Sequence, residues 1–364
     1  MRRASVSALS LVAVSSLVAS LAGCSLIPGN DSDLEDALEV IPSDATTVTF
    51  VGRAAAAERL GVEVGHGADD GEIGRYRAAM DTAGASTRLT PFLGVMGEAA
   101  LSDADVVWEV SGRVEADGVP WTVWKTDDDL DLDEVGDDLA DAGYEESESD
   151  GERRFRADLS AADPETSLVG GRYPVAVMAD VVLVPDEHLV LTGPDVEATL
   201  EVVQDDADSL VDAQELEAVA GAVDDVELAH LRRDIDCAEA FRLGPMNPQQ
   251  AAETAGRLRL EGLARPESTG FLVHGDDGGT TTVLELADDE AAEADAEARG
   301  AWLERVMSVP PPRQSLVEDV TWEIETDGPL VQIDHTFGES SPTTAFAAGR
   351  AADVFALCDP EAGG

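Results

Sequence analysis

The chain has 364 residues, of which 76 are aspartate or glutamate and 23 are lysine or arginine, so its formal net charge is −53. A surface this acidic repels nucleic acid and anionic lipid headgroups, which excludes DNA or RNA binding and membrane attachment through a basic patch. Hydrophobic residues make up 44% of the chain, as in ordinary globular proteins, so the charge does not indicate disorder throughout.

The first 24 residues have the features of a secretory signal. Arg2 and Arg3 form a short positive start, and an apolar stretch diluted by six serines follows as far as Gly23. A lasting transmembrane helix needs roughly 20 strongly apolar residues, and this stretch is too polar to serve as one. The stretch ends on the small residues Ala22 and Gly23, which lead directly into Cys24.

The sequence LAGC at 21–24 resembles the lipobox of bacterial lipoproteins, in which an aliphatic residue and two small residues precede a cysteine. The resemblance implies that residues 1–23 are a cleaved signal peptide and that Cys24 becomes a lipidated N-terminus. Two or more acyl chains anchor a protein stably, whereas a single chain binds only marginally. We therefore expect attachment to the outer face of the cytoplasmic membrane through the lipid on Cys24. The alternative is an ordinary secretory signal with a chance cysteine.

Two cysteines remain in the body of the chain, Cys237 and Cys358. Outside the cytoplasm two thiols favour a disulfide, which here would close a loop of about 120 residues. The alternative is a pair of buried free thiols.

The composition along the chain predicts a tether and two lobes. Residues 24–38 contain proline, glycine and acidic residues and are expected to form a flexible tether. The lobes are expected at 39–207 and 208–364. The first lobe begins with a predicted strand at 45–51, followed by predicted helices at 53–61 and 71–84.

From residue 105 onward, a pattern of two strands, a turn and a helix recurs four times. The four predicted strand pairs lie at 105–126, 175–193, 269–287 and 319–337, each followed by a helix at 131–143, 194–204, 289–307 and 341–358.

Particular residues define these helices. Asp131 is expected to cap the helix at 131–143, and Gly143 to end it. In the helix at 289–307, residues Ala294, Ala298, Trp302 and Val306 are expected on the buried side. In the last helix, Cys358 is expected to face inward.

The pattern predicts an α+β fold with two similar lobes, each an antiparallel sheet built from hairpin–helix units with helices packed on one face. The short match between DVVWEV at 105–110 and DVTWEI at 319–324 suggests a duplication. On a lipobox chain this arrangement resembles the uncharacterised secreted lipoproteins of high-GC actinobacteria. No activity is assigned to those proteins, so the resemblance implies none here.

The densest acidic run, at 127–138, matches a calcium-binding loop only in part. Alternating aspartates occupy ligand positions, but Leu132 replaces the glycine of the sharp turn and Asp138 replaces the bidentate glutamate. An acidic helix start is the favoured interpretation. The acidity of the whole chain fits a saline habitat, a need for solubility or cation binding, and composition does not separate these.

Motifs typical of catalytic, metal-binding or phosphate-binding sites are absent from the sequence. The five histidines are not spaced as metal ligands, and GxSxG, SxxK and phosphate-binding glycine motifs do not occur. We therefore predict no catalytic residue, no metal ligand and no cofactor. Trp121 and Trp124 have opposite parity on one strand and are expected on opposite sheet faces, which disfavours a carbohydrate platform.

The sequence thus predicts an extracytoplasmic lipoprotein that acts by binding or as a structural component of the envelope, without catalysis. Two alternatives stay open: a carrier for an apolar ligand, and an envelope hydrolase with an unrecognised site. The sequence identifies no ligand, protein partner or oligomeric state.

Overall fold

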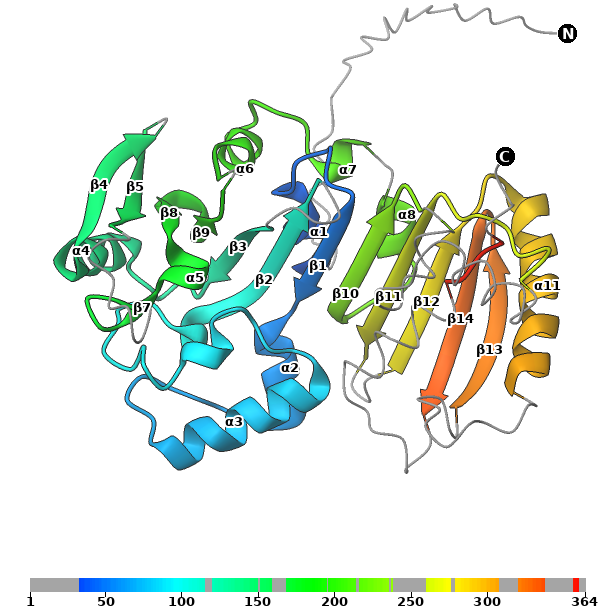
Figure 1. Ribbon diagram of the computed structural model, residues 1–364, viewed down its shortest axis with the longest axis horizontal. Helices are drawn as coiled ribbons and strands as arrows, with labels where there is room; N and C mark the ends of the chain where they lie inside the picture. The colour runs from blue at the N-terminus through cyan, green and yellow to red at the C-terminus, as the bar shows by residue number, and fades with distance from the viewer. Residues whose placement is uncertain are drawn as a thin grey trace, which may run out of the picture. The chain divides into compact units, whose positions relative to one another are not determined.

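A computed structural model describes residues 33–114, 120–149, 151–158, 168–194, 196–213, 216–235, 237, 260–275, 279–307, 320–337 and 356–359 (Figure 1). All of them belong to one compact unit that spans residues 32–364. This unit combines helices with a large antiparallel sheet, which confirms the α+β class.

In the part of the chain that the structure describes, twelve strands form one sheet, and every neighbouring pair is antiparallel. Their order is β13-β14-β12-β11-β10-β1-β2-β3-β9-β8-β5-β4. The strands are β1 (Thr47–Val51), β2 (Val106–Arg113), β3 (Trp121–Thr126), β4 (Tyr144–Ser149), β5 (Glu152–Ala157), β8 (Asp180–Val184), β9 (Leu189–Thr192), β10 (Val226–Arg233), β11 (Ser268–His274), β12 (Gly279–Glu285), β13 (Val320–Asp327) and β14 (Leu330–Phe337). Two short strands, β6 (Leu168–Val169) and β7 (Tyr173–Pro174), pair separately.

The helices connect and cover these strands. They are α1 (Asp33–Glu39), α2 (Arg53–Leu60), α3 (Asp70–Ala83), α4 (Leu132–Ala142), α5 (Val175–Met178), α6 (Val196–Val203), α7 (Leu210–Ala213), α8 (Glu217–Ala220) and α11 (Asp289–Met307). Short 3₁₀ turns lie at Thr90–Phe92, Asp103–Asp105 and Pro185–Glu187. None of the helices in these described ranges has both the length and the apolar character needed to span a bilayer.

Helices pack on both faces of the sheet, whereas one face was expected. On the first face, Phe50 and Val110 are cross-strand neighbours in a core closed by α1, α6, α7 and α8. On the second face, Glu109 and Trp124 are neighbours, and α2, α3, α4 and α11 pack there. The reason lies in the strands, since β8 (DVVLV) and β9 (LVLT) bury both of their sides.

The strands of the two expected lobes belong to one continuous sheet. β1 lies in the first lobe and β10 in the second, and they pair along their length from Thr47–Arg232 to Val51–Leu228. β2 is an internal strand, whereas β13 lies at the sheet edge, so the two matching WE segments occupy different positions. Local strand patterns do not reveal whether two sheets are separate or joined by one pair of strands.

The tether prediction for 24–38 is wrong at its C-terminal end. Residues 33–39 form α1, and Leu34, Ala37 and Leu38 are buried against the first face together with Ile41. These four apolar residues are spaced at i, i+3, i+4 and i+7, which is the stripe of an amphipathic helix. The acidic residues between them give the segment the composition of a polar tether, although its apolar residues have helical spacing.

Local helix signals were accurate for α4. Asp131 accepts hydrogen bonds from the backbone N–H groups of Asp133 and Glu134, and Gly143 ends the helix in the left-handed conformation at φ 102°. Glycine adopts this conformation without the steric cost that a Cβ atom imposes.

The buried side predicted for α11 is confirmed at Trp302, which is buried, and at Ala298, which is half-buried, but not at Ala294. Ala294 is exposed, and the buried side carries Asp295 and Arg299, which form an ion pair at 2.8 Å. The Arg299 side chain also donates to the carbonyl of Leu357, and Asp295 accepts from the backbone N–H of Ala264. These bonds satisfy two buried charges, a tertiary effect that a hydrophobic pattern does not contain.

Three further differences are local. Residues 175–178, expected in a strand, form α5. The hairpin β4–β5 was not expected, because Glu145, Glu148 and their neighbours make it a charged edge hairpin in which Glu148 lies opposite Arg153. Cys358 lies in a non-helical segment, 357–359, rather than in a helix. The remainder of the predicted helix at 341–358 lies outside the described residues.

Candidate functional site

The structure describes two of the three cysteines. Cys24 lies outside the described residues. Cys237 and Cys358 are joined by the expected disulfide, with their Cα atoms 5.4 Å apart, and both are buried beside Ile235.

The acidic run at 127–138 forms the start of α4. Its central aspartate, Asp131, caps the helix, and Leu132 is buried in the core rather than forming a turn. Asp138 accepts a hydrogen bond from Tyr173 and pairs with Arg172 at 2.8 Å. Within the described ranges, no group of three or more His, Cys, Asp or Glu side chains is arranged to hold a metal ion.

The histidines occupy separate positions with local partners. His230 bonds to the hydroxyl of Thr49 at 3.2 Å, and His335 bonds to that of Thr282 at 2.9 Å. Burial lowers the pKa of both imidazoles to about 4, so both are neutral at pH 7. His66 lies at the surface and pairs with Asp105 at 2.8 Å.

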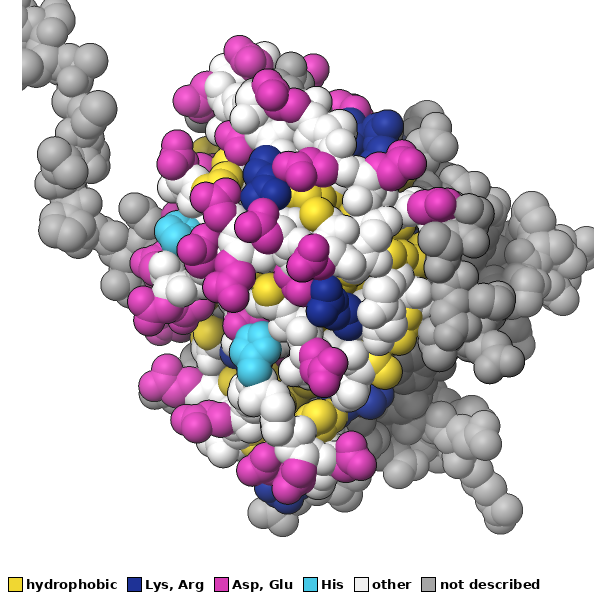
Figure 2. Space-filling view, turned by 90° about the vertical axis from the view of Figure 1, so that its left-hand side faces the viewer, with side chains coloured by type: hydrophobic (Ala, Val, Ile, Leu, Met, Phe, Trp, Pro, Cys, Tyr) yellow, Lys and Arg dark blue, Asp and Glu magenta, His cyan; other side chains and the backbone are white. Residues whose placement is uncertain are grey.

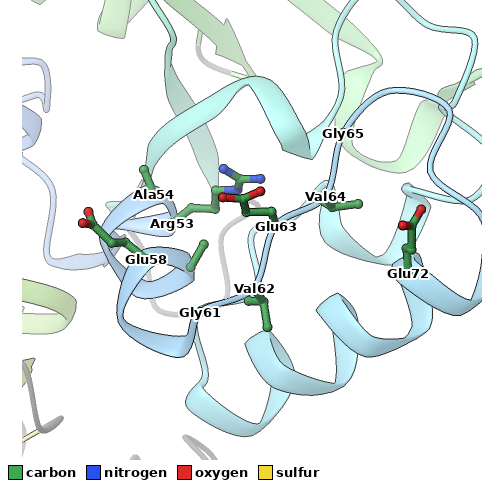
Figure 3. A pocket seen from close by; sticks show the side chains of 10 residues that line it. Arg53, Ala54, Glu58, Gly61, Val62, Glu63, Val64, Gly65 and Glu72 are labelled. Atoms are coloured by element: carbon green, nitrogen blue, oxygen red, sulfur yellow. The ribbon is translucent and has the colours of Figure 1, made fainter.

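A pocket that the sequence did not predict lies between α2, the loop 61–69 and the first turn of α3. Its volume is about 920 Å³ (Figure 3). The lining residues are Arg53, Ala54, Ala57, Glu58, Gly61, Val62, Glu63, Val64, Gly65 and Glu72. The lining therefore combines one guanidinium, three carboxylates and a small apolar wall.

Turn chemistry at both ends of the loop shapes this pocket. Gly61 ends α2 in the left-handed conformation, with its N–H bonded to the carbonyls of Ala57 and Glu58. Asp69 then starts α3 through a capping box, in which Glu72 accepts from the backbone N–H of Asp69 at 3.1 Å. The loop between these two caps is consequently held across the side of α2.

Arg53 is the best-supported charged group in the pocket. The residue is only 9% exposed, and its Nε donates to the hydroxyl of Tyr76 at 2.8 Å. The guanidinium also lies 5.4 Å from the centre of the Tyr76 ring. Among the described residues, no acceptor lies within hydrogen-bond distance of its two Nη atoms.

Asp103 contacts both Tyr76 and Arg53 and fixes their positions. Its fully buried carboxylate accepts hydrogen bonds from Tyr76, Thr87 and Thr90, and it lies 3.7 Å from the Nε of Arg53. Burial, together with this carboxylate, raises the pKa of Tyr76, so the phenol stays protonated and donates. The Arg53 guanidinium is therefore held in a fixed position, and its two Nη atoms can still donate hydrogen bonds to a ligand.

A second buried polar group lies nearby on the second face of the sheet. The side chain of Glu109 accepts from Trp124 Nε1 at 2.6 Å and from the backbone N–H of Arg88 at 2.8 Å. Burial raises the pKa of Glu109 to about 7, against the lowering effect of these two bonds, and Asp103 raises it further. Glu109 does not line the pocket.

One signal in the sequence pointed toward Arg53. An arginine at the first position of a helix opposes the helix macrodipole, which favours acidic residues there. In RAAAAERLG at 53–61 this arginine is followed by four alanines, of which Ala54 and Ala57 line the pocket. Its burial depends on Tyr76 and Asp103, which come from elsewhere in the chain.

Comparisons with known proteins give few similarities. No protein-family model matches the chain, and no curated protein matches its sequence. Solved structures of TP0453, in crystal forms III, IV and I, superpose with TM-scores of 0.43, 0.42 and 0.40 at 9–10% sequence identity. The matches cover 86–88% of this chain and 96–97% of those chains. At these scores the likeness supports no conclusion about function.

Proposed function

We propose that this protein is a lipid-anchored, extracytoplasmic binding protein that acts without catalysis. The observation that carries the binding role is Arg53, a buried cation that is fixed by Tyr76 and Asp103 and has unused donors facing a pocket. Such a group binds and orients a ligand. It needs no further rearrangement to do so, because Tyr76 already holds it.

The proposed location depends on LAGC at 21–24, with Cys24 as the lipid attachment site. Two features support it. The Cys237–Cys358 disulfide is typical of proteins outside the cytoplasm. Acidic side chains are spread over the surface seen in Figure 2, and a net charge of −53 makes electrostatic attachment to anionic lipid unfavourable.

Mass analysis of the natural protein tests the anchor. We expect a mature N-terminus at Cys24 carrying a diacylglycerol thioether, and recovery of the protein in the membrane fraction. Cys24→Ala is expected to abolish both, whereas Ser20→Ala, just before the LAGC motif, leaves both unchanged. An unmodified residue 24 or an intact signal peptide contradicts the proposed location.

The non-catalytic role is tested separately. The purified protein is assayed for hydrolysis of peptide, ester and glycan substrates, and we expect no turnover of any class. Turnover that is lost in Arg53→Met contradicts the binding role and favours the envelope-hydrolase hypothesis. The carrier hypothesis is tested by mass analysis for copurified lipid.

A further inference from the structure

We propose that the Arg53 pocket binds a small zwitterion, with its carboxylate on Arg53 and its ammonium group on Glu63. This inference rests on the proposed binding function and specifies its ligand class. Free amino acids and short peptides with both termini unblocked have this chemistry.

Arg53 provides the carboxylate site. Its Nε is occupied by Tyr76, which leaves the planar pair of Nη groups for a ligand. A guanidinium presents parallel N–H donors that match the two oxygens of a carboxylate. Asp103 lies behind Arg53, on the side of Tyr76, and its oxygen atoms are already engaged by three hydroxyl groups.

Glu63 provides the ammonium site. It lines the same pocket and is exposed, and Figure 3 shows its side chain directed into the pocket together with that of Arg53. No ion pair joins these two lining residues, so the cation and the anion are each able to pair with a ligand in the pocket. Glu72 is less suited to the role, because its carboxylate is engaged in the capping box of α3.

The charge balance selects a zwitterion over an ion. A phosphate or a dicarboxylate would face the carboxylates of Glu58 and Glu63 and the field of a chain with net charge −53. A purely cationic ligand would face the buried charge of Arg53. A ligand with no net charge and separated ends avoids both repulsions and pairs with both groups.

The pocket also has the size and walls that such a ligand requires. Its volume of about 920 Å³ admits an amino acid or a short peptide. Val62 and Val64 are half-buried at its wall and offer an apolar surface to an aliphatic side chain. Gly61 and Gly65 also line the pocket, and both are exposed.

The test compares matched ligands on the intact mature protein in detergent. Isothermal titration and ligand-observed NMR are used with the twenty amino acids and dialanine as zwitterions. N-acetyl-dialanine retains only the carboxylate, dialanine amide retains only the ammonium group, and inorganic phosphate and putrescine are the simple ions. We expect at least one zwitterion to bind at millimolar concentration or below, and each singly blocked form to bind about tenfold or more weakly.

Variants assign the two contacts. Arg53→Lys keeps the positive charge but loses the planar pair of N–H donors. Glu63→Gln keeps the shape of the side chain but loses its negative charge. Each substitution is expected to weaken zwitterion binding by about tenfold. Glu325→Gln, on the exposed edge strand β13, is the matched control and leaves binding unchanged. Thermal unfolding of each variant establishes that it is folded, and Glu63→Gln alters an exposed side chain only.

Each of the following results contradicts the proposal that the pocket binds a zwitterion. The proposal is wrong if no zwitterion binds. It is also wrong if the singly blocked forms bind as tightly as the unblocked zwitterion. Tighter binding of phosphate or N-acetyl-dialanine than of every zwitterion by the native protein makes the pocket an anion site instead. All these outcomes leave the anchoring test on Cys24 unaffected, so failure of this inference is distinguishable from failure of the proposed location.

Discussion

At the scale of single residues, buried polar groups distinguish this protein most clearly. Arg53, Glu109 and Arg299 are all at most 9% exposed, and each has specific partners. A buried charge is costly unless such partners compensate it, so these residues fix local geometry as well as charge. Among them, Glu109 is the one whose ionisation changes near neutral pH.

Glu109 makes the stability of the protein depend on pH. Its pKa is about 7 in the folded protein, against 4.5 without burial, so between these values the folded state holds a proton that the unfolded chain has released. The free energy of unfolding therefore contains a term that is complete below pH 4.5 and is lost as the pH rises through 7. The full shift corresponds to roughly 3 kcal/mol.

Glu109→Gln is expected to remove this term. The amide oxygen of glutamine can accept the same bonds from Trp124 and Arg88 while carrying no charge. Urea unfolding is measured for both proteins from pH 4.5 to 8, and the difference between them is expected to grow in favour of the variant as the pH rises. Curves that stay parallel over this range contradict the pKa assigned to Glu109.

At the scale of secondary-structure elements, the packing of β2 against β3 depends on one glycine. Gly112 lies opposite Trp121 on the first face of the sheet, and the indole ring occupies the space above it. A Cβ atom at residue 112 would lie 1.9 Å from the ring. The tryptophan therefore needs a residue without a side chain as its neighbour.

Gly112→Ala is accordingly expected to lower the free energy of unfolding by about 2 kcal/mol or more, because Trp121 must leave its position. Gly74→Ala is the matched control, since Gly74 is exposed within α3 and open space surrounds its would-be Cβ. There alanine is expected to stabilise by about 0.5–1 kcal/mol through helix propensity. Chemical denaturation measures both, and equal effects of the two substitutions would rule out the steric explanation.

At the scale of the whole molecule, covalent and polar contacts secure the segment at 356–359. Cys358 is linked to Cys237, which follows β10, and the carbonyl of Leu357 accepts from Arg299 of α11. The backbone N–H of Asp359 donates to the carbonyl of Leu263. Segments widely separated in sequence are thereby joined near one end of the sheet order, where β14 and β13 complete the sheet.

Removal of the disulfide is expected to destabilise the whole unit. The bridge spans 121 residues, and in the loop-entropy account closing so long a loop contributes about 4–5 kcal/mol. Cys237→Ala with Cys358→Ala is expected to shift the urea midpoint downward, and reductant is expected to shift the native protein in the same direction. Reductant should have no effect on the double variant, and insensitivity of the native protein to reductant would contradict the bridge.

The sequence by itself determined the features whose causes are local. Asp131 and Gly143 mark the ends of α4, and Gly61 and Gly84 end α2 and α3, because cap and glycine chemistry act over a single turn. Alternating strands joined by short turns determined the antiparallel α+β class, and the two cysteines that remain beside Cys24 favoured a disulfide over two free thiols.

Only the tertiary structure decided how these parts join. The pairing of β1 with β10 merges the expected lobes into one sheet, and the charged hairpin β4–β5 completes its edge. The ion pair of α11 and the pocket around Arg53 depend on partners far away in the sequence, such as Leu357 for Arg299 and Asp103 for Arg53. A buried charge is stable only where distant groups satisfy it, and neighbours along the chain do not specify those groups.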